Sequence, residues 1–422
     1  MYKKTTLDNG VKVITNRMPG MRSAALGIWI KIGGRYETAE NKGISHYLEH
    51  MLFKGTKRYS LRKIKESIEG VGGSLNAFTA EEVTCFLAKL PASKLEVALS
   101  ILSDMVLDPL LPEDEFIKEK TVILEEIKMY RDLPQSYVFE LLDALLWPNQ
   151  PLGMEVIGTV ESVQRMQRKD LAQFKGAHYT PYNIVVSAAG ALTHERVATI
   201  VSRVFSKSKE KKKNTFLAAT QQQAAFQLKV LDKDTEQSHL ALGFHGLKRD
   251  HPLRYALTLL HVILGGNMSS RLFNEIREKR GLAYEIASQV KRFYDTGAFI
   301  VHAGMDNRKV EDAVSLILQE LYRTKDTLVT PGEFNRAKEF FLGQLTLALE
   351  DTLEHMLWLG ESLSLIDKAY TLNEIIAKVK KTTRRDIQEA ARTVFIRENL
   401  NAALIGPLRD REESLFQALR SV

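Results

Sequence analysis

Apolar and polar residues follow two different periods in the first quarter of the chain. Alternating or continuous apolar runs at 11–15 and 24–31 predict β-strands, and the runs 75–79 and 84–90 predict a pair of strands. The segment 93–106 instead repeats its apolar residues at helical spacing. Strands and helices therefore come in small mixed groups. We expect an α+β protein whose helices pack on antiparallel sheets.

Two more helices are predicted by their start signals. Ser60 is a good N-cap for a helix over 60–69. Pro112, followed by three acidic residues, opens another helix that continues to about residue 129. The glycines at 70–73 predict a turn. No Lys-Ser/Thr pair follows them, which argues against a phosphate-binding loop.

The segment GISHYLEHMLFKGT, residues 43–56, carries the candidate chemistry. His46, Glu49 and His50 have the spacing H-x-x-E-H, and positions i and i+4 share one face of a helix. Gly55 is expected to end that helix in a left-handed conformation. A single helical histidine is usually only a satisfied side chain. Two histidines and a glutamate in this pattern predict a metal-binding helix.

Composition limits the kind of site that is possible. The 422 residues suggest two or three domains, and 44% hydrophobic and 26% charged residues are typical of a soluble globular protein. The single cysteine, Cys85, excludes an internal disulfide and a thiolate zinc cluster, and it suits a reducing compartment. Any metal would therefore be held by histidine and carboxylate.

The chain shows no targeting or membrane signal. Its start, MYKKTTLDNGVKVITN, lacks an apolar signal core, and no apolar run reaches 18 residues. We therefore expect a cytoplasmic protein without a membrane span. The net charge of +7 is mild, and no base-reading module is present, so nucleic acid is not expected as a partner.

The two halves of the chain resemble each other. Residues 168–192 align with 384–408 at a constant shift of 216. Between the halves lies SKSKEKKKN, which is interpreted as a solvated linker, the alternative being a polyanion-binding patch. We expect two homologous domains, at 1–205 and 223–422, joined by a lysine-rich linker at 206–222.

The second copy serves as a control for the motif in the first. Leu257 stands opposite His46 and Leu260 opposite Glu49, so only His50 has a histidine counterpart, His261. The fold can therefore exist without H-x-x-E.

A third ligand is sought on the helix after Pro112, because a catalytic zinc site needs three protein ligands and an open position. Glu119 and Glu126 share one apolar stripe, whereas Glu125 lies off it. Their counterparts in the second copy are Ala337 and Gln344, so both acids disappear together with the motif. The alternative is that they are ordinary surface acids.

These features resemble the pitrilysin, insulysin and mitochondrial processing peptidase family of inverted-zincin metallopeptidases. In that family H-x-x-E-H is followed, some 75 residues later, by a glutamate ligand, and 75 residues separate His50 from Glu126 here. The resemblance implies one Zn²⁺ per chain, held by His46, His50 and Glu126, with Glu119 as an accessory acid. It covers essentially the whole chain and is nearest to the short, two-domain bacterial members.

The resemblance also implies substrate-binding residues. Asn76 and Ala77 match the edge strand along which family members bind the substrate backbone, and Phe53 matches a pocket-lining residue. Arg277 and Tyr284 match an Arg/Tyr pair that binds the substrate carbonyl and stabilises the oxyanion. The alternatives are an ordinary core phenylalanine, a surface arginine and a strand tyrosine.

The function implied is that of a zinc-dependent endopeptidase. Glu49 would act as general base for the water that attacks a peptide bond. A clamshell homodimer enclosing peptides or unfolded segments is expected. The alternatives are a non-catalytic subunit and one half of a heterodimeric processing peptidase, and a basic nucleic-acid-binding protein ranks third.

Overall fold

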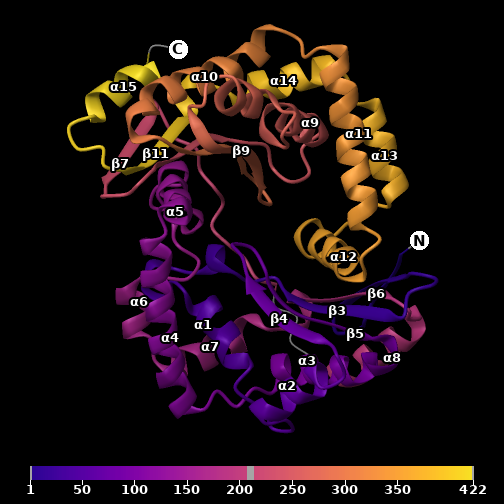
Figure 1. Ribbon diagram of the computed structural model, residues 1–422. Coiled ribbons are helices and arrows are strands. Elements are labelled where there is room, and N and C mark those ends of the chain that lie inside the picture. Colours follow the sequence, from indigo (N-terminus) through magenta and orange to yellow (C-terminus); the bar gives the residue numbers. More distant parts are fainter. Residues whose placement is uncertain (1, 207–212, 421–422) are drawn as a thin grey trace. The chain divides into compact units, whose positions relative to one another are not determined.

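The computed structural model describes residues 2–206 and 213–420 and contains two compact units (Figure 1). Unit 1 comprises Met1–Lys128, Met154–Leu217 and Thr346–Thr371. Unit 2 comprises Met129–Gly153, Ala218–Leu345 and Leu372–Val422. Each unit is a sheet with helices on both faces, which confirms the predicted α+β class.

Unit 1 is built on a six-stranded sheet with the order β1-β2-β6-β3-β5-β4. Its strands are β1 (Lys3–Thr6), β2 (Lys12–Arg17), β3 (Ser23–Ile30), β4 (Ser74–Thr79), β5 (Thr84–Pro91) and β6 (Ile184–Gly190). The β2–β6 pair is parallel and the other pairs are antiparallel, so the sheet is mixed rather than wholly antiparallel as expected. The predicted strand pair is the β4–β5 hairpin, where Ala77 lies opposite Phe86.

Eight helices of the described residues accompany this sheet. They are α1 (Ile44–Leu52), α2 (Leu61–Glu69), α3 (Leu95–Leu107), α4 (Glu113–Asp132), α6 (Val160–Arg165), α7 (Arg168–His178), α8 (His194–Phe205) and α12 (Thr352–Ile366). The Ser60 side chain accepts a hydrogen bond from the Lys63 N–H at 3.3 Å, which confirms the predicted N-cap of α2. In Figure 1, α3 and α8 cover one face of the sheet and α12 covers the other.

Strand β3 has no polar side chain from Ala24 to Ile30, and both of its faces are buried there. Leu26 and Ile28 belong to the main core beneath α1 and α3, whereas Trp29 packs with α12. The Trp29 indole donates a hydrogen bond to Ser187 Oγ at 2.8 Å. A β-carbon at position 360 would lie 2.0 Å from Trp29 Nε1, so the close approach of α12 requires Gly360.

Unit 2 repeats this plan on a five-stranded sheet with the order β7-β11-β8-β10-β9. Its strands are β7 (Gln227–Asp232), β8 (Ser238–His245), β9 (Ala283–Arg292), β10 (Gly297–Met305) and β11 (Leu400–Gly406). Its helices are α5 (Pro134–Leu146), α9 (Arg254–Gly265), α10 (Val310–Asp326), α11 (Pro331–Ala348), α13 (Leu372–Lys381), α14 (Arg384–Val394) and α15 (Glu412–Arg420), with a π-helical turn, η6 (Phe273–Glu278).

The order of strands confirms the internal repeat. Strands β2, β6, β3, β5 and β4 of unit 1 correspond in position to β7, β11, β8, β10 and β9 of unit 2, and the pair at one end is parallel in both sheets. Helices α9 and α11 accordingly correspond to α1 and α4.

The division of the chain differs from the contiguous domains expected at 1–205 and 223–422. Segment 129–153 belongs to unit 2 and segment 346–371 belongs to unit 1. The cause is burial of apolar surface: Leu142 and its neighbours on α5 pack on β8 and β11, and Leu359 and its neighbours on α12 pack on β3. Each half of the chain thus supplies one helix to the other unit.

The predicted linker at 206–222 is only partly solvated. Residues 207–212 lie outside the described residues. Asn214 is buried and donates a hydrogen bond to the Lys31 carbonyl at 2.8 Å, and the Phe216 ring lies 3.9 Å from the Arg35 guanidinium. Residues 213–217 are therefore held on unit 1, whereas residues 218–222 belong to unit 2, where the Ala219 N–H donates a hydrogen bond to Asp295 at 3.0 Å. None of the described helices is both long enough and apolar enough to cross a membrane.

Candidate metal site

Helix α1 is fixed at its N-terminus by a buried glutamate. Glu37 accepts hydrogen bonds from the N–H groups of Gly43 at 2.9 Å and Ser45 at 2.8 Å, and its carboxylate lies 3.5 Å from Lys42 Nζ. Gly43 has φ +91°, and a β-carbon there would lie 2.6 Å from the Ile157 carbonyl oxygen. An acid is favourable at this end of a helix, where backbone N–H groups lack partners. The start of α1 is thus defined by the hydrogen bonds to Glu37 and the close approach of Ile157 to Gly43, not by the helix propensity of its residues.

The helix presents His46 and His50 on one face, opposite Glu126 of α4. His46 Nε2 lies 3.9 Å from Glu126 Oε2, and His50 Nε2 lies 3.7 Å from the same oxygen. One ligand atom from each of the three residues can be chosen so that all lie within 4.8 Å of one another. Tetrahedral zinc with bonds of about 2.0–2.2 Å separates its ligand atoms by about 3.3–3.6 Å. The three side chains therefore fit such an ion after small rotamer adjustments.

The protonation state of His46 suits metal binding. Burial, with a smaller contribution from His50, lowers the pKa of His46 to about 3, so its ring is neutral at physiological pH. A neutral imidazole is the form that binds a metal. Within residues 2–206 and 213–420 this is the one group of three or more His, Cys, Asp or Glu side chains close enough to hold an ion.

Glu119, also on α4, orients His50. Its Oε2 lies 2.9 Å from His50 Nδ1, and its Oε1 lies 2.5 Å from Lys54 Nζ. Burial alone would raise the pKa of Glu119, but the hydrogen bonds from Lys54 and His50 lower it. The ionised carboxylate holds the proton of His50 on Nδ1, which leaves the Nε2 lone pair directed toward Glu126. Glu125, excluded from the stripe in the sequence, is exposed and pairs with Lys128 at 2.7 Å.

Glu49 lies beside this group and is held by the edge strand. The Thr79 hydroxyl, at the end of β4, donates a hydrogen bond to Glu49 Oε2 at 2.6 Å. Burial raises the pKa of Glu49, and the hydrogen bond from Thr79 partly opposes the rise. A buried carboxylate with a raised pKa is suited to accept and return a proton.

The predicted substrate strand is the edge of the unit 1 sheet. Asn76 and Ala77 lie on β4, the last strand of the sheet, and Asn76 is exposed. Asn76 Oδ1 accepts a hydrogen bond from the Ala77 N–H at 2.9 Å, so a side chain occupies a main-chain donor that an added strand could use. Phe53 is half-buried against the unit 1 core, with its ring 6.2 Å from that of Phe86.

Arg277 and Tyr284 belong to unit 2. Arg277 lies on the π-helical turn η6 and Tyr284 on β9, where 73% of the tyrosine is exposed. The Arg277 guanidinium lies 4.7 Å from the centre of the Phe273 ring and 5.5 Å from that of Tyr284. The two predicted residues are thus neighbours within their own unit.

Of the candidate ligands, the second copy keeps a counterpart for one histidine alone. Leu257 and Leu260 are fully buried, and Ala337 is also buried. His261 Nδ1 is hydrogen-bonded to Ser288 Oγ at 2.8 Å, and burial lowers the pKa of His261 to about 4. The counterpart of His50 is therefore a satisfied core residue.

Three residues that support the site were not predicted from the sequence: Glu37, Lys54 and Thr79. Lys54 and Thr79 lie inside segments that the sequence did single out, GISHYLEHMLFKGT and SLNAFT. Lys54 lies one helical turn after His50, and this spacing could have indicated it as the cationic partner of Glu119. Glu37 had no comparable signal, because it precedes the helix in an irregular segment.

Family models match both halves of the chain. The model described as insulinase, peptidase family M16, covers residues 12–160, and the model described as peptidase M16 inactive domain covers residues 165–341. The chain belongs to peptidase family M16. The first model contains the predicted H-x-x-E-H helix and Glu126, and the second contains the counterpart positions Leu257, Leu260 and Ala337.

Proteins similar to this chain occur in several bacteria. An uncharacterized zinc protease of Bacillus subtilis, YmxG, is 38% identical over 96% of this chain and 98% of its own length. An uncharacterized zinc protease of Streptomyces coelicolor is 36% identical over 98% of this chain and 91% of its own length. The crystal structure of a protease from Helicobacter pylori has the same fold, with a TM-score of 0.92 at 23% identity over 96% of this chain and all of that chain.

Proposed function

We propose that this M16 peptidase is a zinc-dependent endopeptidase that cleaves peptides or unfolded polypeptide segments. The observation that carries the proposal is the convergence of His46, His50 and Glu126, with Glu49 buried beside them. The names of the bacterial relatives, which are zinc proteases, support the choice of metal.

In the proposed reaction the metal would activate the water molecule, and the side chains would hold the metal and transfer the proton. A bound Zn²⁺ would supply Lewis acidity and an acidified water molecule. The residues that would hold it are His46, His50 and Glu126, with Glu119 fixing the tautomer of His50.

Glu49 would move the proton. Thr79 donates its hydrogen bond to Oε2 of Glu49, and Oε1 has no hydrogen-bond partner among the described residues. Oε1 would therefore accept a proton from the attacking water. The same atom would then deliver that proton to the nitrogen of the leaving amine. The substrate backbone would add to β4 beside Thr79 by displacing the Asn76 side chain from the Ala77 N–H.

The other residues implied by the family resemblance enter the proposal as substrate-binding groups. Tyr284 would donate its hydroxyl to the oxyanion and Arg277 would bind a substrate carbonyl. Phe53 would line the pocket beyond the cleaved bond. We further propose that the protein acts as a homodimer, and a cytoplasmic location remains our prediction.

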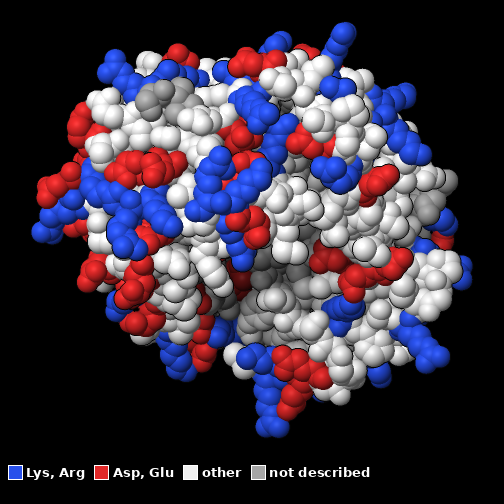
Figure 2. Space-filling view, turned by 45° about the horizontal axis from the view of Figure 1, so that its top comes forward, with Lys and Arg blue, Asp and Glu red and all other residues white. Residues whose placement is uncertain are grey.

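The alternatives receive less support. A non-catalytic or heterodimeric processing-peptidase-like subunit would be expected to lack part of the site, whereas the complete H-x-x-E-H motif, Glu119 and Glu126 are present. Nucleic-acid binding is not favoured by the surface charge. Figure 2 shows lysine and arginine interspersed with aspartate and glutamate over the face it displays, without a continuous basic stripe.

Metal removal and restoration test the proposal. Purified protein is expected to contain close to one zinc per chain and to cleave an unstructured peptide. Dialysis against a chelator should abolish cleavage, and stoichiometric zinc should restore it. Cleavage that persists after the metal has been removed would refute zinc dependence.

A further inference from the structure

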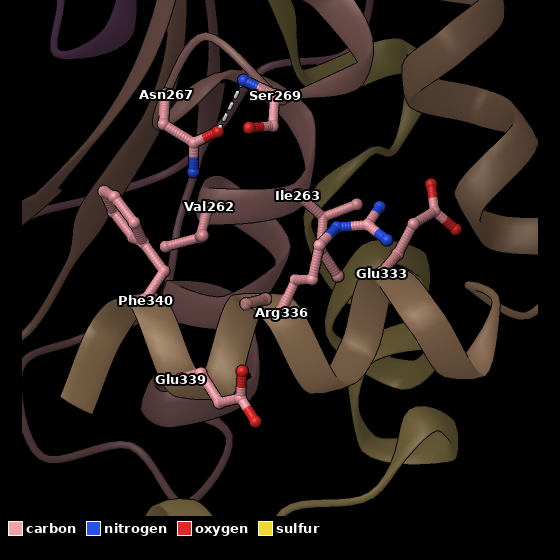
Figure 3. A pocket seen from close by; sticks show the side chains of 9 residues that line it. Val262, Ile263, Asn267, Ser269, Glu333, Arg336, Glu339 and Phe340 are labelled. Carbon is pink, nitrogen blue, oxygen red and sulfur yellow. Dashed lines mark hydrogen bonds between the residues drawn. The ribbon is translucent and has the colours of Figure 1, made fainter. Parts of the chain in front are cut away.

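Charged side chains gather at two places outside the candidate metal site. One is a cavity of about 270 Å³ between α9 and α11 of unit 2, which is lined by Arg336 and by two acids, Glu333 and Glu339 (Figure 3). These opposing charges select no ligand. The other place is a cluster of lysines on unit 1, at the C-terminal end of α12, where positive charge is clearly in excess.

Three of these lysines lie on the face of the unit 1 sheet that carries α12. Alternate residues of a strand share one face, and both Ile14 of β2 and Trp29 of β3 pack on α12. Lys12 precedes Ile14 by two residues, and Lys4 of β1 lies directly opposite Ile14. Lys31 follows Trp29 by two residues. The sheet therefore brings the three side chains to one face, beside the end of α12.

Two of the ammonium groups converge on a single carboxylate. Asp367 ends α12 with φ +54°, and its Oδ1 lies 2.5 Å from Lys12 Nζ and 3.6 Å from Lys4 Nζ. Cations are favourable at the C-terminal end of a helix, where backbone carbonyl groups lack partners. Asp367 and the end of α12 therefore account for the charges of Lys4 and Lys12.

Two further lysines of the cluster, Lys31 and Lys213, have no acidic partner. Asn214 donates a hydrogen bond to the Lys31 carbonyl at 2.8 Å, which holds the neighbouring Lys213 close to Lys31. Within residues 2–206 and 213–420, neither ammonium group makes an ion pair or a hydrogen bond. Lys31 is half-buried and Lys213 is exposed. Two positive charges therefore lie side by side without compensation.

The excess charge acts on Lys31. Burial, and after it the charges of Lys12, Lys213 and Lys4, lower the pKa of Lys31 to about 8, whereas Asp367 opposes this shift. A bound anion would remove the repulsion among the lysines. Lysines act as point charges, whereas arginine is the side chain suited to bidentate recognition of a carboxylate. The cluster therefore favours the charge of a ligand over its shape, and its two uncompensated cations match two negative charges.

From this arrangement we propose that Lys31 and Lys213, flanked by Lys4 and Lys12, bind a small, doubly charged oxyanion such as inorganic phosphate. The anion lies between the ammonium groups of Lys31 and Lys213. A single carboxylate is disfavoured because it would leave one of these two cations without a partner. None of the four lysines belongs to the candidate metal site, so the proposal does not depend on peptidase activity.

Calorimetry on the full chain at pH 7 would compare phosphate, sulfate and acetate. Phosphate and sulfate are expected to bind at least about tenfold more tightly than acetate, because each can neutralise both uncompensated ammonium groups. Acetate that binds as tightly as sulfate would overturn the requirement for a double charge. A DNA duplex that binds more tightly than phosphate, at the same concentration of phosphate groups, would overturn the small anion as the occupant.

The pH dependence of sulfate binding is a second readout, because the charge of sulfate is constant at neutral and alkaline pH. The pKa of Lys31 is about 8 before binding, so Lys31 is mostly protonated at pH 7 and mostly neutral at pH 9. The affinity for sulfate should therefore be about tenfold lower at pH 9 than at pH 7. An affinity that stays the same over this range would contradict a contact between Lys31 and the anion.

Variants separate this cluster from the metal site. Lys31→Gln should weaken sulfate binding at least about tenfold at pH 7 and remove its pH dependence. Lys213→Gln, at an exposed position where folding is not at risk, should weaken it as well. The matched control is Lys3→Gln, because Lys3 neighbours Lys4 on β1 but pairs with Glu195 of α8, on the opposite face, at 2.6 Å.

The control should bind sulfate as tightly as the wild type. If Lys31→Gln and Lys213→Gln also bind sulfate as tightly as the wild type, the assignment is refuted, and this is the result expected if the anion binds at the metal site instead. No measurement requires cleavage, so an inactive metal site would leave these results unaffected.

Discussion

His50 and Glu119 form a hydrogen bond of 2.9 Å between Nδ1 and Oε2, and this bond sets the direction in which His50 presents its other nitrogen. That nitrogen lies 3.7 Å from Glu126. In the proposed site the two acids on α4 would therefore have separate tasks, Glu119 orienting His50 and Glu126 binding the metal.

Glu119→Gln should weaken zinc binding by about 10–100-fold, because the amide cannot supply the negative charge that fixes and polarises His50. The measurement is a zinc titration in competition with a chelator. Glu125→Gln is the control, since Glu125 lies on the same helix and pairs with exposed Lys128, its one ion-pair partner within the part of the chain that the structure describes. Equal affinities of the two variants would show that Glu119 does not support the metal.

Gly43→Ala should destabilise the protein by about 3 kcal/mol, because a side chain at φ +91° costs about 1–2 kcal/mol and overlap with the Ile157 carbonyl adds more. Gly20→Ala is a matched control, with φ +88° and no atom within 4 Å of an added β-carbon. Its expected cost is about 1–2 kcal/mol. Denaturant unfolding of both variants measures the difference, and equal costs would mean that the contact with Ile157 does not define the start of α1.

Glu333→Gln should lower the free energy of unfolding by about 2 kcal/mol at pH 7, and by progressively less as the pH falls. Burial alone would raise the pKa of Glu333, but hydrogen bonds from Arg271 and Thr330 lower it from 4.5 to about 2. A lowered folded-state pKa gives stability that is complete above pH 4.5 and is lost as the pH falls toward 2.

Urea unfolding of wild type and variant at pH 7 and pH 3 would test this dependence on Glu333. Glu339→Gln, which removes an exposed acid on the same helix, should have little effect at either pH. If Glu333→Gln lowers the free energy of unfolding as much at pH 3 as at pH 7, the pKa of Glu333 is not lowered in the folded protein.

Tyr284→Phe should lower kcat by about 100-fold while zinc content stays unchanged, because the variant lacks one donor to the oxyanion. Peptide cleavage kinetics and metal analysis measure the two quantities. Tyr294→Phe, at another exposed tyrosine of unit 2, is expected to keep full activity. If Tyr284→Phe cleaves peptide as fast as the wild type, Tyr284 has no role in the reaction.

The parts of the structure that could be predicted were those encoded locally. The helix around His46 and His50, the N-cap Ser60 and the β4–β5 hairpin all follow from short patterns, and the structure confirms them. The repeat singled out Glu119 and Glu126 together, because both acids are lost in the second copy along with the motif, and the family resemblance then assigned Glu126 as the expected ligand.

The exchange of α5 and α12 between the two units could not be predicted. The sequence repeat is the same whether each helix packs on the sheet of its own half of the chain or on the sheet of the other half. The hydrogen bonds from Thr79 to Glu49 and from Gly43 to Glu37 were also hidden, since each joins segments whose proximity is decided by packing.

The most direct test of the central claim is the effect of Glu49→Gln on zinc content and on cleavage of an unstructured peptide, measured on the same preparation. The variant should retain close to one zinc per chain and lose at least about 10²-fold in kcat, because the amide cannot accept a proton. A variant that keeps its zinc and cleaves as fast as the wild type would show that Glu49 is not the general base.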